Sequence, residues 1–191
     1  MARESKFWLE VRRQFLHFLF GSVFIALVVL LGTRTTLEIL AACLLLGLAF
    51  SFAISKGAKI PIISTVVNKV EREHEKNIPG KGAIFFFAGA IIVILIFQNQ
   101  LIILGALCAL IYGDSASTVF GLRFGKHRLI GKRTLEGTTA GILAALPFLA
   151  ALFPLPIAIA TAVIAMLAEL LPVNDNFSIP IAAAITLAIL I

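Results

Sequence analysis

Residues 101–114 read LIILGALCALIYGD, an apolar run that ends at an aspartate. Similar runs recur along the chain, which is 60% hydrophobic and 14% charged, with a mean hydropathy of +1.06. An average soluble domain is about a quarter charged. An apolar run of roughly 18 residues can cross a hydrocarbon core about 30 Å thick. The sequence therefore predicts an all-α integral membrane protein, a polytopic helix bundle whose residues 1–191 form a single domain.

About seven transmembrane helices are expected, several of them short for a full crossing, at residues 14–32, 36–55, 82–97, 100–120, 138–153, 155–171 and 178–191. Pro154 and Pro156 separate the fifth from the sixth, and Pro172 and Pro180 flank the loop LPVNDNFSIP, because proline interrupts a helix. The N-terminal segment, residues 56–81 and residues 121–137 hold four, six and five Lys/Arg, whereas the opposite side has only Arg34. The positive-inside rule then makes the N-terminus and the polar face cytoplasmic.

Other classes of protein fit this composition poorly. Cys43 and Cys108 lie inside apolar runs and are interpreted as packing residues, and the absence of Cys/His clusters argues against a zinc site. The net charge of +6 comes from short connections beside spans, so topology explains it better than a nucleic-acid partner does. The first apolar run is too long for a signal peptide and is expected to remain as a span.

Asp114 is the first candidate for chemistry. It lies roughly 20 Å along its helix from the outer end, inside the membrane or at its inner boundary. An ionisable group at that depth is costly and marks a functional site by default, although pairing with an arginine of another span would be a structural alternative. Ser117 and Thr118, three and four residues on, share its helix face.

Residues 121–137 are the most polar segment. Gly121 and Gly125 have GxxxG spacing, which serves either close helix packing or backbone approach to a ligand. A run of cations and polar residues suited to phosphate follows: Lys126, His127, Arg128, Lys132, Arg133, Thr134, Glu136 and Gly137. The glycine spacing does not match a P-loop, and binding of anionic lipid would explain the cations alone.

Three weaker groups complete the candidates. EREHEKNIPGKG contains Glu71, Glu73 and Glu75 with Lys81, and is either a solvated loop or a carboxylate source for Mg²⁺. Glu169 is a buried acid near the inner end of a span, and Asn174, Asp175 and Asn176 form a turn or helix cap. In RRQFLHF, Arg13 and His17 share a helix face, and His17 requires a partner such as Asp114 or Glu169.

These motifs resemble the dolichol kinase, phytol kinase and CTP-dependent diacylglycerol kinase family, which is related to the phosphatidate cytidylyltransferases. The resemblance covers most of the chain and rests on RRQFLH, EREHE, PGKG, the long segment GDSASTVFGLRFGKHRLIGKRTLEGT, and Glu169 followed by NDNFSIP. It implies transfer of the γ-phosphoryl group of CTP to the hydroxyl of a polyprenol-type lipid alcohol, with Mg²⁺. By that analogy the nucleotide site contains Asp114, Gly121, Gly125, Lys132, Thr134, Glu136 and Gly137. Lys132-Arg133 stands where the family often has two lysines.

The residues and the resemblance together give four expected sets. The catalytic set is Asp114, Glu136 and Glu169, and the metal set is Asp114, Glu136 and Glu73. The nucleotide set is Gly121, Gly125, Lys126, Lys132, Arg133, Thr134, Gly137 and Lys81. The set expected to contact lipid or to support the site is Arg13, His17, Asn174, Asp175 and Asn176.

Two other functions stay open at this stage. A cytidylyltransferase would make a CDP-lipid and release pyrophosphate. A small transporter belongs to another class, but transporters place polar groups near the midplane, whereas here they gather on one face. The lipid alcohol is not specified by the sequence, membrane lipids are expected as surroundings, and short spans with GxxxG favour a homodimer.

Overall fold

A computed structural model describes residues 2–58, 60 and 78–191, with side chains from residue 7 onward. Within these ranges the chain is all-helical, as predicted, and its β structure is limited to an isolated bridge between Arg128 and Thr134. The helices are α1 (Ala2–Ser55), α3 (Lys81–Phe97), α4 (Gln100–Cys108), η2 (Ala109–Asp114), α5 (Ser115–Phe124), α6 (Leu135–Ala150), α7 (Leu155–Ala168) and α8 (Asp175–Leu190).

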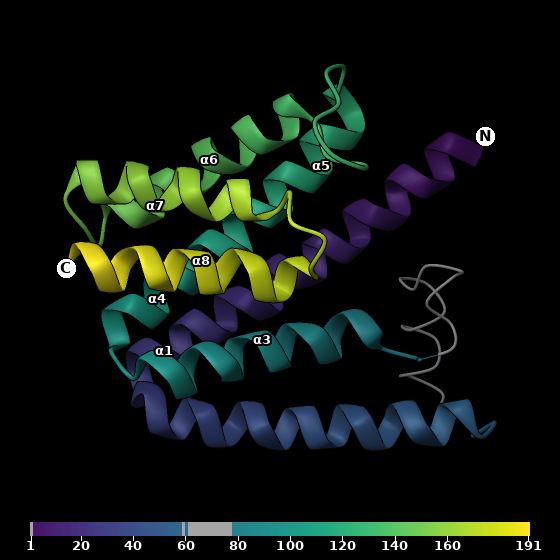
Figure 1. Cartoon of the computed structure of the whole chain (residues 1–191). Helices are drawn as coiled ribbons and strands as arrows, with labels where there is room; N and C mark the ends of the chain where they lie inside the picture. The colour runs from purple at the N-terminus through teal and green to yellow at the C-terminus, as the bar shows by residue number, and fades with distance from the viewer. Residues whose placement is uncertain (1, 59, 61–77) are drawn as a thin grey trace.

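The long α1 is two helices joined at a sharp turn. Gly32 has a φ of 78°, a left-handed conformation that residues with a side chain rarely adopt, and the chain turns back on itself there (Figure 1). The two halves of α1 meet at this turn and diverge from it in Figure 1, which agrees with the separate helices expected at residues 14–32 and 36–55. Arg34 and Glu38 pair at 3.5 Å beyond the turn.

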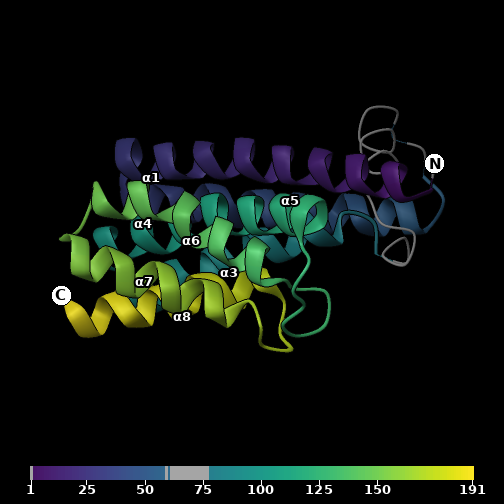
Figure 2. The same cartoon turned by 90° about the horizontal axis from the view of Figure 1, so that it is seen from above.

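A continuous helical rod, residues 100–124, runs through the middle of the bundle. It consists of α4, the π-helix η2 and α5, with the first half of α1 along one side and α8 along the opposite side (Figure 2). Its start is fixed by Asn99, whose side chain accepts a hydrogen bond from the backbone N–H of Leu101 at 2.9 Å. Close packing depends on small residues, since a Cβ added at Gly113 would lie 2.6 Å from the sulfur of Met166.

Two helical stretches, Phe7–Ser55 and Gln100–Phe124, are long and apolar enough to cross a bilayer. The rod is mostly buried, whereas α1 exposes large apolar side chains such as Leu30 (78% exposed) and Leu45 (67%). The other apolar helices, α3, α6, α7 and α8, have 14 to 17 residues. Exposed apolar surface of this kind marks contact with a membrane or a partner.

Helices α6 and α8 each begin three residues before the expected spans, at Leu135 and Asp175 rather than at 138 and 178. Pro154 is the N-cap of α7 and ends the break after α6, as FPLP predicts. The predicted loop up to Pro180 is too long, because α8 begins at Asp175 and contains Pro180. Pro180 is the sixth residue of α8, so the helical hydrogen bond that it cannot donate is the one to the Asn176 carbonyl oxygen. Asp175 and Asn176 therefore lie in the first turn of α8 and not in a loop.

Candidate functional site

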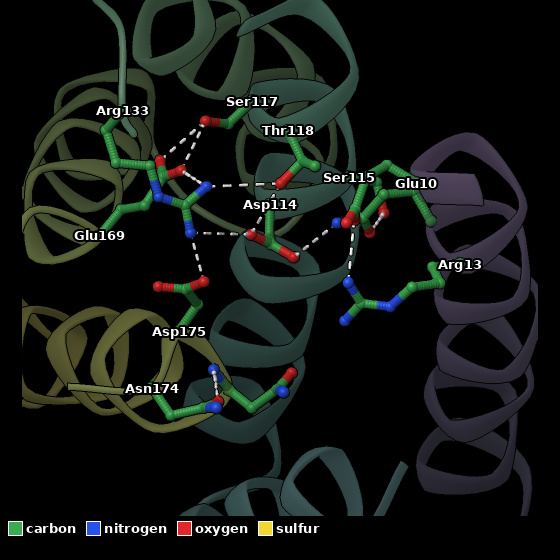
Figure 3. Close-up of polar contacts among 12 residues, drawn as sticks. Glu10, Arg13, Asp114, Ser115, Ser117, Thr118, Arg133, Glu169, Asn174 and Asp175 are labelled. Atoms are coloured by element: carbon green, nitrogen blue, oxygen red, sulfur yellow. Dashed lines mark hydrogen bonds and ion pairs between the residues drawn. The ribbon is translucent and has the colours of Figure 1, made fainter. Parts of the chain in front are cut away.

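The main polar centre is a cluster of three carboxylates around one guanidinium, here called the acid–arginine cluster: Asp114, Arg133, Glu169 and Asp175 (Figure 3). Arg133 Nη1 pairs with Glu169, Arg133 Nη2 pairs with Asp175, and Nη2 lies 3.9 Å from Asp114 Oδ1. Asp114 ends η2, Glu169 follows α7, Asp175 opens α8 and Arg133 comes from the loop before α6. The fold thus brings together residues up to 61 positions apart in sequence, counted from Asp114 to Asp175.

Burial makes this cluster electrostatically strong. Asp114 is 7% exposed and Glu169 is 3% exposed, and a charge removed from water to this degree needs a partner. Burial alone would lower the pKa of Arg133, but the carboxylates of Asp114, Glu169 and Asp175 outweigh it and raise that pKa. Arg133 therefore stays a cation that neutralises part of the acidic charge.

Two hydroxyl groups of α5 support the carboxylates. Ser117 Oγ lies 2.7 and 2.8 Å from the two oxygens of Glu169, and Thr118 Oγ1 lies 3.5 Å from Asp114 Oδ1. Thr118 Oγ1 also accepts a hydrogen bond from Arg133 Nη1 at 3.4 Å. The prediction that Ser117 and Thr118 share a face with Asp114 is confirmed. The site begins at the end of a π-helix, a distortion common at functional sites.

The first half of α1 closes the other side of Asp114. Gln14 Nε2 donates to Asp114 Oδ2 at 3.3 Å, and Gln14 Oε1 accepts from Ser115 Oγ at 3.4 Å. The two oxygens of Asp114 therefore face different neighbours, with Oδ1 toward Arg133 and Thr118 and Oδ2 toward Gln14. The sequence analysis missed Gln14, although its place between Arg13 and His17 in RRQFLH was a usable signal.

His17 and Arg13 do not join the acid–arginine cluster directly. The His17 ring lies 4.4 Å from the Phe86 ring and bonds the backbone of Leu110, and its buried Nε2 has no partner among the described residues. The expected bond from His17 to Asp114 or Glu169 is thus absent in that part of the chain. Arg13 Nη1 pairs with Glu10 at 2.9 Å, and its side chain reaches the start of α3 near Gly82.

Glu136 bonds the backbone of the polar loop and does not belong to the acid–arginine cluster. Its carboxylate accepts hydrogen bonds from the backbone N–H of Lys126 at 3.1 Å and of His127 at 3.2 Å, and it contacts His127 Nδ1 at 2.6 Å. Backbone and His127 hydrogen bonds lower the pKa of Glu136 well below its usual value. Glu136 is therefore an anion that already accepts the backbone N–H donors of its own loop. A phosphate would have to compete with Glu136 for these donors.

Gly121, Gly125 and Gly137 of the polar segment are packing positions in this structure. A Cβ added at Gly125 would lie 2.2 Å from the Gly121 carbonyl oxygen, and one at Gly137 would lie 2.7 Å from the Ser117 carbonyl oxygen. Thr134 sits among them and caps α6 by accepting from Gly137 N–H at 3.2 Å. Gly121 and Gly125 thus serve contact between α5 and α6 within the chain, the packing alternative for GxxxG. The motif no longer supports a homodimer.

The remaining predicted residues lie around the cluster. Lys126 and Lys132 are exposed on the loop, and Lys81 Nζ lies 5.6 Å from the Phe85 ring centre at the start of α3. Asn174 caps α8 by accepting from Asn176 N–H at 3.0 Å, which confirms the helix-cap interpretation. The Asn176 carbonyl lies against Gly89, where a Cβ would be 1.9 Å away.

The predicted metal set is not assembled. Glu136 is engaged with the loop, and Glu73 lies outside the described residues. Among the residues that the structure describes, no group of three or more His, Cys, Asp or Glu side chains is arranged to hold a metal ion. The point where three carboxylates converge is taken by the Arg133 guanidinium, so these residues as placed do not fit a resident Mg²⁺.

Fold and site define the class as an all-helical, strongly apolar protein with a partly buried acid–arginine cluster. The chain is 30% identical over 181 residues to Uncharacterized protein MJ1137 of Methanocaldococcus jannaschii, covering 92% of this chain and 91% of the relative. It belongs to the family of that protein. No protein-family model and no solved structure matches the chain.

Proposed function

We propose that the chain is a polytopic membrane enzyme that transfers the γ-phosphoryl group of CTP to the hydroxyl of a polyprenol, dolichol or related lipid alcohol. The carrying observation is the cluster of the buried Asp114 and Glu169 with the partly exposed Asp175 and Arg133, beside the exposed cationic loop. Phosphoryl transfer requires mainly positioning and neutralisation of charge, which such groups supply. The resemblance to lipid kinases described above points to the same reaction.

The proposal includes seven membrane-crossing segments and a cytoplasmic active face. The two halves of α1, then α3, the rod, α6, α7 and α8 would be the seven segments. The exposed apolar side chains of α1 and the bias of Lys/Arg toward one side support this arrangement. The acid–arginine cluster would then lie at the cytoplasmic ends of the rod, α7 and α8.

Asp114 is the proposed proton acceptor, because its polar contacts are longer than those of Glu169, the other buried carboxylate. Both oxygens of Glu169 are bonded by Ser117 and one is paired with Arg133, whereas Asp114 makes contacts of 3.3 to 3.9 Å. Long contacts of this kind are readily exchanged for a substrate hydroxyl. Glu169 would position Arg133 and Ser117.

In the proposed step the hydroxyl oxygen of the lipid alcohol forms a bond to the γ-phosphorus. The bond from that phosphorus to the β–γ bridging oxygen breaks, CDP leaves with the bonding electrons, and the hydroxyl proton passes to Asp114. Lys126, Lys132 and Arg133 would neutralise the charge of the phosphates. Mg²⁺ is taken here as part of the substrate, the Mg–CTP complex.

The test is phosphoryl transfer by purified protein in nanodiscs, with a panel of lipid alcohols and nucleotides labelled at the γ- or α-phosphate. Label from the γ position in the lipid is expected, and label from the α position would instead establish a cytidylyltransferase. Because the active face is proposed to be cytoplasmic, sealed inside-out vesicles should be active without detergent. Right-side-out vesicles should become active only after the membrane is made permeable to the nucleotide.

Asp114→Asn keeps the shape of the side chain and removes its basicity, so turnover should fall at least about 100-fold, within the usual contribution of general base catalysis. Glu38→Gln is the matched control, because Glu38 is a 67% exposed carboxylate outside the acid–arginine cluster and should leave turnover unchanged. Wild-type turnover by Asp114→Asn would rule out the assigned role.

A further inference from the structure

A groove opens on the side of the bundle between the first half of α1, the start of α5 and α6. Its volume is about 360 Å³, within the range of about 300–1,000 Å³ typical of small-ligand sites. Its walls are apolar and aromatic, with Phe18, Tyr112, Val119 and Phe148 among them. Tyr112 stacks on Phe148 at 3.5 Å between ring centres and meets Phe18 edge-on at 5.4 Å, so this wall is a built aromatic surface.

Two polar side chains in the wall of the groove connect it to the acid–arginine cluster. Gln14 and Ser115 line the groove, bond each other at 3.4 Å, and Gln14 bonds Asp114 Oδ2 at 3.3 Å. Gln14 is 9% exposed, so its amide is a nearly buried donor and acceptor among the apolar lining residues. Both of its hydrogen bonds are long, and a hydroxyl group placed there can replace them.

We propose that this groove holds one hydrocarbon chain of the acceptor alcohol, with the hydroxyl between Gln14 and Asp114. The inference rests on the proposed function and specifies the acceptor end of the same site. A long-chain primary alcohol has an apolar tail for the aromatic walls and a single terminal group that donates and accepts hydrogen bonds. The Gln14 N–H would donate to the hydroxyl oxygen, and the hydroxyl proton would point to Asp114 Oδ2.

The second described hollow does not compete for this role. It has a volume of about 160 Å³ and lies between the second half of α1 and the start of α3, lined by residues such as Leu44, Ile54 and Phe87. None of its lining residues belongs to the acid–arginine cluster or bonds Asp114. The groove beside Gln14 is therefore the better candidate for the acceptor chain.

The proposal can be tested by photo-crosslinking without nucleotide, so that binding is measured independently of turnover. The probe is a C20 primary alcohol with a diazirine in its chain, added to the protein in phosphatidylcholine nanodiscs. Crosslinks are expected on peptides containing Tyr112 and Phe148. Excess unlabelled alcohol should remove them, whereas the hydrocarbon without the hydroxyl should not.

Two variants sharpen the test. Ala144 lines the groove and Leu143, its 63% exposed neighbour on α6, is not among the lining residues. Ala144→Phe should reduce crosslinking at least tenfold, and Leu143→Phe should leave it unchanged. Gln14→Leu should preserve crosslinking but abolish the preference for the alcohol over the hydrocarbon.

The outcomes separate the groove from the reaction. Crosslinks that are spread over the outer surface of α1, or that survive Ala144→Phe, would overturn the groove and leave only surrounding membrane lipid. Hydroxyl-dependent crosslinks in a protein that phosphorylates no alcohol would support the groove and refute the kinase. Kinase activity on long-chain alcohols that Ala144→Phe leaves intact would refute the groove alone.

Discussion

Replacing Arg133 with methionine removes the cation of the acid–arginine cluster while keeping a long, unbranched side chain. The Glu169 carboxylate is fully buried and that of Asp114 is 9% exposed, so both would remain in a poorly solvated place without a positive partner. Removing one partner of a buried ion pair typically costs about 3–5 kcal/mol. For a chain of this length each kcal/mol corresponds to roughly 2–4 °C, so Tm should fall by about 6–20 °C.

The measurement is thermal unfolding in detergent micelles, followed by circular dichroism of the helical signal. The matched control is Arg34→Met, since Arg34 is 93% exposed and pairs with Glu38 at 3.5 Å in contact with solvent. Such surface pairs contribute about 0–1 kcal/mol, so this variant should melt within about 4 °C of the unaltered protein. The double variant Arg133→Met/Glu169→Gln should recover part of the loss, because it removes one of the stranded charges.

The reasoning would be refuted if Arg133→Met melted together with Arg34→Met, or if Glu169→Gln gave no recovery in the double variant. Arg133→Lys provides a finer comparison, because lysine keeps the charge but lacks the planar fork that reaches Glu169 and Asp175 at once. It should melt between the unaltered protein and Arg133→Met.

Two further predictions concern the polar segment. Gly137→Ala should destabilise the protein by about 1–3 kcal/mol, because its Cβ would lie 2.7 Å from the Ser117 carbonyl oxygen. The control is Gly47→Ala on α1, where a Cβ meets nothing within 4 Å, and it should be neutral or stabilising in the same thermal unfolding experiments. Glu136→Gln should lower the hydrogen-exchange protection of the Lys126 and His127 amides at pH 7. Because the pKa of Glu136 is depressed, its contribution is fully present above its ordinary value of 4.5 and is lost as pH falls toward the lowered pKa. Between pH 7 and pH 5, Glu136 should therefore cause no change in the hydrogen-exchange protection of these amides in the unaltered protein. A loss of protection in that range that depends on Glu136 would contradict the assignment.

The helices could be predicted because their signals are local. Apolar runs and the breaks at Gly32, Asn99 and Pro154 lie within a few residues of the features they determine. The start of α8 was predicted three residues late, because the Asn and Asp residues before it favour turns as well as helix N-termini. The grouping of Asp114 with Ser117 and Thr118 also followed from spacing on one helix.

The composition of the acid–arginine cluster could be predicted only in part, because it depends on which loop side chain enters the bundle. Arg133 and Lys132 are adjacent and similar in sequence, yet Arg133 binds the three carboxylates and Lys132 is exposed. The family resemblance grouped Glu136 with Asp114, but the loop folds back so that Glu136 bonds Lys126 and His127. Such choices are set by tertiary packing, and no local pattern records them.

Asp114 connects the two halves of the proposed mechanism, because its oxygens face opposite neighbours. Oδ1 lies toward Thr118 and Arg133, on the side of the cationic loop, and Oδ2 lies toward Gln14 in the wall of the groove. A water-soluble donor and a lipid acceptor need such a place, since neither can enter the other's solvent. The loop side can hold charge because Arg133 stays cationic, and the groove side can hold a hydrocarbon chain because its walls are aromatic. A substitution that changes one side only, such as Gln14→Leu, should therefore alter the choice of lipid while leaving the acid–arginine cluster folded.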